Sequence, residues 1–266
     1  MTGAFEHRPK DIKNFILLTE NRELGMPEIE LRMLWKRYNL LAQFGANNDV
    51  LDIGSGQSLG WEELNQVCRK IITADLSFEN LTAAKDSGVT RQINCSAEKL
   101  PFLKDSFDLV SALEMIYYLE NQGAFFSECH RVLRPGGKIL ITMPNPSRRG
   151  FHKSPHATEY LDVIESHQYL GEMGFSTQVF GSFRINKSLL NTVLAVCFRV
   201  CITLRLVPRS LRGRARIKRF LQGKLYSFES LADLTKLLKE TDYELIPLDK
   251  CNPNFSVLYV IGTKIS

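Results

Sequence analysis

A buried strand that runs directly into a glycine turn limits the folds open to this chain more than any other stretch does. Residues 50–53 are Val-Leu-Asp-Ile, and Gly-Ser-Gly follows at once. Glycines placed after a strand let the backbone approach a ligand closely and expose amide groups at the start of a helix. The stretch therefore predicts the first strand, turn and helix of an α/β fold whose ligand lies at the turn.

Strand and helix patterns alternate along the chain on both sides of this turn. Short apolar runs between breaking residues predict strands at 50–53, 70–74, 89–95, 107–112 and 138–143. Apolar residues at helical spacing predict helices at 28–44, 61–69, 81–87 and 125–133. The alternation predicts βαβ units with right-handed crossovers, and hence a doubly wound, mostly parallel sheet.

The segments that follow the fifth strand are less regular. The helical pattern resumes at 158–173, and two stretches, 175–183 and 243–248, compete for the sixth strand. A helix at 228–240 and an apolar run at 255–263 complete the pattern. Between the fourth helix and the fifth strand, residues 134–137 (Arg-Pro-Gly-Gly) are expected to form a turn.

Two acidic residues indicate what the glycine turn binds. Asp52 stands two residues before Gly54, where it would repel a pyrophosphate but attract a ligand that carries an ammonium group. Ser58 occupies the place of the third glycine of the dinucleotide fingerprint. Asp75 ends the second strand, where a carboxylate can accept both ribose hydroxyls. These residues favour an adenosine cofactor with a positive charge over a dinucleotide.

The chain resembles the class I S-adenosylmethionine-dependent methyltransferases, in particular the broad group called methyltransferase type 11. The matching stretches, in family order, are VLDIGSG (50–56), ITADLS (72–77), CSAEKLPF (95–102), SFDLVSALEMIYYL (106–119) and RVLRPGGKILITMPN (131–145). They cover a little over a third of the chain. The resemblance implies a Rossmann-like fold and S-adenosylmethionine as the cofactor, and it says almost nothing about the methyl acceptor.

The resemblance also implies roles for individual residues. Those around the methionine part of the cofactor would be Asp52, Gly54, Ser55, Gly56 and Ser111. Those around its ribose and adenine would be Asp75, Leu76, Ser96 and Ala97. Many relatives carry an acid in place of Ser96 and a histidine in place of Tyr118. This chain therefore lacks the acidic contact to the adenine and the histidine base of those relatives. Purely structural roles compete with this interpretation: Asp52 as a turn cap, Asp75 as the cap of a helix that begins near Ser77.

The methyl acceptor needs its own residues. Oxygen as the acceptor atom calls for a base, and ligands of such sheets bind beyond the carboxyl ends of the strands. The candidates there are His152 and His156, which follow the fifth strand, and Tyr118. Loop histidines without a catalytic role are the competing interpretation. Pro155 argues against a helix that would pair the two histidines on a metal, so we expect no metal site.

The charge of the chain is unevenly distributed. Of its 34 basic residues, eleven lie between Met173 and Phe228, a stretch without Asp or Glu, so the rest carries 23 basic against 29 acidic residues. Residues 188–206 are apolar on a wide face, and 209–220 are strongly basic. We expect a methyltransferase domain of residues 1–187 and 229–266, interrupted by a basic, apolar-helix insertion at 188–228.

The insertion at 188–228 indicates which molecules the protein binds besides the cofactor. We favour a lid or acceptor-binding role, with a small-molecule acceptor that is anionic or lipid-linked; a solvated face and peripheral membrane contact through 188–224 are the alternatives. Nucleic acid is disfavoured because the motif of nucleic-acid N-methyltransferases is missing after the fourth strand. The chain start shows no secretory signal, and the six cysteines include no CxxC pair, so we expect a cytoplasmic protein with reduced thiols.

The sequence therefore predicts a methyltransferase that most readily methylates an oxygen of a sugar, lipid-linked or secondary-metabolite acceptor. The competing hypotheses are a membrane-associated methyltransferase of a quinone or lipid and a non-catalytic S-adenosylmethionine-binding protein, with an RNA methyltransferase behind both.

Overall fold

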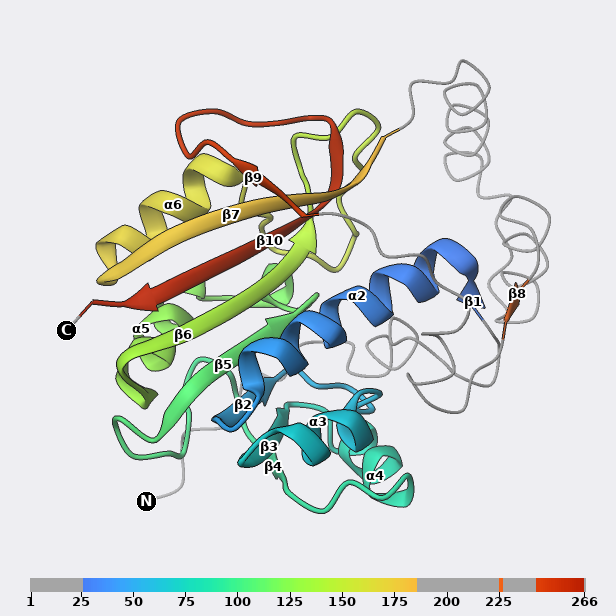
Figure 1. The fold of residues 1–266 in the computed structure, drawn as a ribbon, viewed down its shortest axis with the longest axis vertical. Helices are drawn as coiled ribbons and strands as arrows, with labels where there is room; N and C mark the ends of the chain where they lie inside the picture. The colour runs from blue at the N-terminus through green and yellow to red at the C-terminus, as the bar shows by residue number, and fades with distance from the viewer. Residues whose placement is uncertain (1–25, 186–224, 227–242, 266) are drawn as a thin grey trace.

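The computed structural model describes residues 26–185, 225–226 and 243–265, and their main element is a twisted sheet flanked by helices (Figure 1). The sheet has eight strands in the order β4-β3-β2-β5-β6-β10-β7-β9. The strands are β2 (Asp49–Ile53), β3 (Lys70–Asp75), β4 (Gln92–Asn94), β5 (Phe107–Leu113), β6 (Leu133–Pro144), β7 (Phe175–Arg184), β9 (Glu244–Ile246) and β10 (Phe255–Lys264). A separate antiparallel pair joins β1 (Met26–Pro27) to β8 (Leu225–Tyr226).

Helices cover both faces of the sheet. The helices are α2 (Glu28–Gly45), α3 (Trp61–Val67), α4 (Phe78–Asp86), α5 (Gln122–Val132) and α6 (Val163–Glu172), with a 3-10 turn η1 (Ile116–Tyr118). The core on one face joins side chains of α2, α3 and α4 to the sheet, and the core on the other joins those of α5 and α6 (Figure 1). The inner strands β2, β5 and β10 are mostly buried on both faces, which explains their apolar runs. The predicted α/β class with a doubly wound, mostly parallel sheet is confirmed.

The strand order resolves the competition for the sixth strand. Both candidate stretches form strands: 175–183 lies within β7, and 243–248 contains the short edge strand β9. Neither lies next to β6, because β10 inserts antiparallel between β6 and β7. The apolar run at 255–263 is therefore a central strand, and the choice between the other two stretches was too narrow.

Several predicted boundaries are wrong; among them, α5 begins at Gln122, three residues earlier than predicted, and α6 begins at Val163, five residues later. Helix α4 begins at Phe78, three residues earlier than expected, because Ser77 caps it by accepting a hydrogen bond from the Asn80 backbone N–H. Strand β4 is confined to Gln92–Asn94. Residues 134–137, the predicted turn, bulge out of β6: Leu133 before them pairs with Phe107 of β5 and Lys138 after them pairs with Leu109, and Gly136 has a φ of 75°.

The buried Lys36 of helix α2 fixes this helix to β7, near one edge of the sheet. The Nζ of Lys36 donates to Ser182 Oγ at 2.7 Å and lies 3.8 Å from the ring centroid of Tyr243. The Tyr243 hydroxyl in turn donates to the Lys36 carbonyl at 3.1 Å. These contacts hold α2 across the face of the sheet on which Asp52 lies.

The expected insertion at 188–228 lies outside the described residues apart from 225–226, and the helix expected at 228–240 lies wholly outside them.

Candidate active site

The glycine turn lies where the strand order of the sheet reverses, between β2 and β5. The Gly54 backbone N–H donates to the Ala74 carbonyl at 2.7 Å, which ties the turn to β3. Gly54 and Gly56 have φ values of 66° and 54°, a region that favours glycine. A Cβ on Gly54 would stand 2.7 Å from the Met115 side chain, which follows β5. The turn therefore packs directly against the residues after β5, and a ligand at this crevice contacts both.

Asp75 joins this turn to the start of α4. Its Oδ2 accepts the Gly56 backbone N–H and its Oδ1 accepts the Ser77 backbone N–H, both at 2.8 Å. Burial raises the pKa of this carboxyl, and the two backbone N–H groups oppose the rise. The helix cap is Ser77, so Asp75 is not the cap that the structural interpretation proposed. It instead presents a half-buried carboxylate at the carboxyl end of β3.

Asn94, which sequence reasoning missed, fixes the backbone beside Asp75. Its Nδ2 donates to the carbonyls of Asp75 and Leu76, each at 2.9 Å. The only sequence signal was a polar residue at the end of a predicted strand. Leu76 is held with 57% of its surface exposed, a large fraction for a leucine, so this edge offers an apolar surface next to a carboxylate.

Asp52 lies under α2 and is 2% exposed. Its Oδ1 accepts the hydroxyl of Ser111 on β5 at 2.6 Å, and Ser111 is fully buried. Burial raises the pKa of Asp52 from 3.8 to about 7; Asp75 adds to the rise, while Ser111 and the Arg37 guanidinium oppose it. A cation bound at the turn would stabilise the ionised form of this carboxyl.

Two serine hydroxyls beside the turn are buried without a partner. Ser55 and Ser58 are 8% and 4% exposed, and neither Oγ makes a hydrogen bond within the described residues. Buried hydroxyls are normally satisfied, so these two suit a polar ligand group. Together with the glycine backbone, the two carboxylates and Leu76, they fit the charged methionine part and the adenosine of the cofactor that the resemblance implies.

The residues predicted at the adenine edge follow β4. Ser96 is half-buried and its Oγ accepts the Glu98 backbone N–H at 3.2 Å. Ala97 is 7% exposed and belongs to the core on the α5 side. The Cys95 backbone N–H donates to the Asp75 carbonyl at 3.3 Å, so this loop lies beside the carboxyl end of β3.

An aromatic cluster and a carboxylate occupy the edge beyond β5 and β6. The Tyr117 ring stacks on that of Tyr160 with 4.5 Å between centroids, and Tyr118 lies 4.5 Å from Tyr117. The Tyr117 hydroxyl donates to Glu114 Oε2 at 3.1 Å. Burial raises the pKa of both Tyr117 and Tyr118. Glu114 has a φ of 58°, a rare conformation for a glutamate, and such conformations cluster at functional sites.

The two predicted histidines lie on the exposed loop after β6. His152 and His156 are both exposed, and the His156 backbone N–H donates to Ser154 Oγ at 3.3 Å. Within the described residues, no group of three or more His, Cys, Asp and Glu side chains is arranged to hold a metal ion. None of the described helices is both long and apolar enough to cross a membrane.

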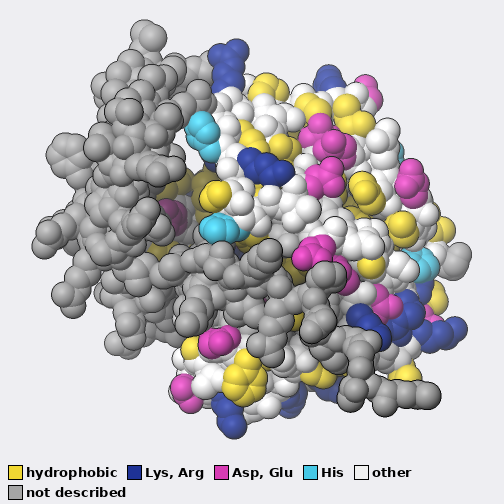
Figure 2. Space-filling model, turned by 180° about the vertical axis from the view of Figure 1, so that it is seen from behind, with side chains coloured by type: hydrophobic (Ala, Val, Ile, Leu, Met, Phe, Trp, Pro, Cys, Tyr) yellow, Lys and Arg dark blue, Asp and Glu magenta, His cyan; other side chains and the backbone are white. Residues whose placement is uncertain are grey.

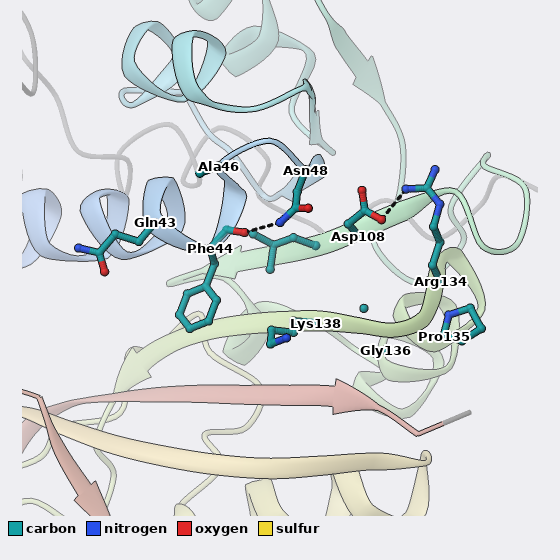
Figure 3. Close-up of a pocket in the computed structure, with 11 residues that line it drawn as sticks. Gln43, Phe44, Ala46, Asn48, Asp108, Arg134, Pro135, Gly136 and Lys138 are labelled. Atoms are coloured by element: carbon teal, nitrogen blue, oxygen red, sulfur yellow. Dashed lines mark hydrogen bonds and ion pairs between the residues drawn. The ribbon is translucent and has the colours of Figure 1, made fainter.

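A hollow of about 450 Å³ lies at the end of the strands opposite to the glycine turn (Figure 3). It is lined by residues near the end of α2 and the starts of β5 and β6, among them Phe44, Asn48, Asp108 and Lys138. Its guanidinium group, Arg134, is paired with Asp108 at 2.7 Å. The hollow is therefore distinct from the glycine turn.

Acidic and basic side chains are mixed over the described surface in Figure 2. The described residues seen from this side do not gather their lysines and arginines into one broad basic face. On this face the described residues therefore form no basic patch of the kind that binds nucleic acid.

Comparisons with known proteins agree with this geometry. Residues 51–141 match a family described as a methyltransferase domain, of type 11. A protein of Mycolicibacterium smegmatis named "Probable S-adenosylmethionine-dependent methyltransferase" is 31% identical over 148 residues, which are 53% of this chain and 57% of that protein. A ubiquinone biosynthesis O-methyltransferase of a Bradyrhizobium strain is 28% identical over 42% of this chain and 46% of its own length. The chain thus spans less than two thirds of these relatives.

Solved structures support the same fold. The crystal structure of an S-adenosylmethionine-dependent methyltransferase from Archaeoglobus fulgidus superposes with a TM-score of 0.55 at 16% identity, covering 88% of this chain and 94% of that one. This coverage is larger than the stretch matched by the family, residues 51–141. Residues 51–141 thus match a methyltransferase domain of type 11, and the sheet has the Rossmann-like fold of the class I S-adenosylmethionine-dependent methyltransferases.

Proposed function

We propose that this chain transfers the methyl group of S-adenosylmethionine to an oxygen atom of a small-molecule acceptor. The observation that carries the proposal is the contact between two half-sites. The glycine turn and Asp75 suit the cofactor, and Gly54 packs against Met115, which lies between Glu114 and Tyr117 of the aromatic cluster. Cofactor and acceptor would therefore meet at one crevice.

The chain's own residues would hold the cofactor by charge and shape. Asp75 would accept the ribose hydroxyls, Leu76 would cover the adenine, and the carboxylates of Asp52 and Asp75 would favour a positively charged ligand. The hydroxyls of Ser55 and Ser58 would bind the polar groups of the methionine part. The bound cofactor supplies an electrophilic methyl group on a sulfonium.

On the acceptor side the residues would position an oxygen and take up its proton. Methyl transfer is an in-line displacement, so holding the two reactants in line and excluding water supplies much of the rate. Tyr118 would line the acceptor pocket. His152 and His156 are the proposed candidates for the base, and their exposed loop directly follows β6. The ubiquinone O-methyltransferase among the relatives supports oxygen as the acceptor atom.

The test is a transfer assay with the full chain. It uses S-adenosylmethionine and a panel of phenols, sugars and quinols, and follows the acceptor-dependent formation of S-adenosylhomocysteine. We expect activity with at least one hydroxyl acceptor and its loss in Asp75→Ala. Removal of the base among His152→Ala, His156→Ala and Tyr118→Phe should lower kcat by about 10²–10⁴-fold.

The competing hypothesis makes a different prediction in the same assay. A non-catalytic S-adenosylmethionine-binding protein would bind the cofactor in a direct titration and release no S-adenosylhomocysteine with any acceptor. Cofactor binding without turnover across the panel would contradict the proposed activity.

A further inference from the structure

Arg148 is an unusual arginine at the acceptor edge. It lies four residues after β6, is half-buried, and its side chain makes no ion pair and no hydrogen bond within the described residues. Its Nε is buried without an acceptor. Other described arginines near carboxylates are paired with them, namely Arg69, Arg131, Arg134 and Arg184. A guanidinium that is partly removed from water and left with open donors suits an incoming anion.

The turn that carries Arg148 is rigidly anchored. Asn145 is fully buried, and its Nδ2 donates to the carbonyls of Asn252 and Phe255 at 2.8 and 2.9 Å. The Arg148 backbone N–H donates to the Asn145 carbonyl at 3.3 Å, and the Phe151 N–H donates to the Arg148 carbonyl at 3.1 Å. The backbone that carries Arg148 is therefore held in place, which lowers the part of the entropic cost of ligand binding that comes from ordering this turn.

The surroundings of Arg148 match an aromatic acceptor. Its Cζ lies 5.9 Å from the Phe151 ring centroid, and Phe151 contacts Tyr160 edge-to-face at 4.8 Å. Tyr160 stacks on Tyr117, whose hydroxyl is donated to Glu114. Arg148 thus stands at one end of a continuous line of rings that reaches the residues after β5.

The charge of this loop favours an anion. Residues 146–158 contain no Asp or Glu, whereas they include two arginines, one lysine and two histidines. Burial lowers the pKa of Arg148, while Glu114 and Tyr160 raise it. Glu114 is the acidic group that faces this guanidinium, and it already accepts the Tyr117 hydroxyl.

We propose that Arg148 binds an oxyanion group, a carboxylate or a phosphate, on an aromatic acceptor whose ring lies against Phe151 and Tyr160. This inference rests on the proposed function, because it takes the bound molecule to be the methyl acceptor. It assigns a class of substrate to the site. A guanidinium presents a planar fork that matches either group with two hydrogen bonds.

The test is a binding measurement on the full chain, with and without S-adenosylhomocysteine. The probes are benzoate and phenyl phosphate, which separate the two kinds of anion, and benzamide as the neutral match of benzoate. The variants are Arg148→Gln and Arg148→Lys. Arg149→Gln is the matched control, because Arg149 is the adjacent arginine and is exposed. Thermal unfolding checks that each variant is folded.

We expect benzoate or phenyl phosphate to bind the wild type and Arg149→Gln with similar affinity. Arg148→Gln should bind that anion about 10- to 100-fold more weakly, as expected for the loss of charge-assisted hydrogen bonds, with Arg148→Lys in between. Benzamide affinity should not change among the variants.

Three results would overturn the inference: no anion binding by the wild type, equal anion binding by Arg148→Gln, or an equal loss in Arg149→Gln, which would indicate a diffuse charge effect. The S-adenosylhomocysteine titration is read separately. Absence of S-adenosylhomocysteine binding would count against the proposed function. Anion binding measured without S-adenosylhomocysteine would still test the role of Arg148.

Discussion

Replacing Asp52 with asparagine should stabilise the cofactor-free protein, and the gain should grow with pH. Asparagine keeps the shape of the side chain and can still accept the Ser111 hydroxyl, which now lies 2.6 Å from Asp52 Oδ1. It removes a charge that burial makes costly. The pKa of Asp52 is raised from 3.8 to about 7, so the folded protein holds this proton to higher pH than the unfolded chain does.

The size of the effect follows from linkage. Because the folded pKa is raised, the wild type loses stability as the pH rises from about 4 to about 7, and the loss is complete above that. Each pKa unit corresponds to about 1.4 kcal/mol, so the wild type has lost about 1.5 kcal/mol of this stability at pH 5 and about 4.5 kcal/mol at pH 8. The advantage of Asp52→Asn should therefore increase by about 3 kcal/mol between these pH values.

Urea denaturation at pH 5 and pH 8 measures this difference. The exposed Asp86, changed to asparagine, is the control for the loss of one surface carboxylate. Equal m values would show that the unfolded states are comparable. An advantage of Asp52→Asn that stays constant or shrinks from pH 5 to pH 8 would refute a carboxyl whose ionisation is opposed by burial.

Three further variants test individual contacts. In urea denaturation, Gly54→Ala should lower the free energy of unfolding by about 2–4 kcal/mol, because the new Cβ would meet Met115. Gly88 has open space around it, so Gly88→Ala should cost only the backbone strain of about 1–2 kcal/mol. Equal costs would contradict the close packing of the turn. Asn145→Ala should cost about 2–4 kcal/mol by leaving buried carbonyls unsatisfied, and a loss below 1 kcal/mol would count against that anchor. Two arginines lower the pKa of Asp49 to about 2, so Asp49→Asn should remove stability that the wild type has above pH 4 and loses as the pH falls toward 2; an unchanged acid transition would argue against this pairing.

The parallel part of the sheet could be predicted because its signals are local. The runs at 50–53, 70–74, 107–112 and 138–143 are apolar, and breaking residues bound them, so period and length identify them without knowledge of their neighbours. The position of β10 between β6 and β7 depends on pairing between segments far apart in the chain, and no local pattern encodes it.

The candidate site divides in the same way. Gly54, Asp52 and Asp75 stand at fixed offsets from predicted strand ends, so the sequence indicates them directly. Asn94 is distinguished by its hydrogen bond to the backbone of a neighbouring strand. Arg148 is distinguished by a buried Nε that has no hydrogen-bond partner within the described residues. Such properties depend on which segments meet in space, and hence they became visible only in the structure.

Calorimetric titration of S-adenosylhomocysteine into the wild type and Asp75→Ala tests the cofactor assignment most directly. We expect binding by the wild type in the micromolar range, on the order of −8 kcal/mol, and a loss of at least about tenfold in the variant, with thermal unfolding as the check that the variant is folded. No binding by the wild type, or equal binding by a folded Asp75→Ala, would contradict a cofactor site at the glycine turn.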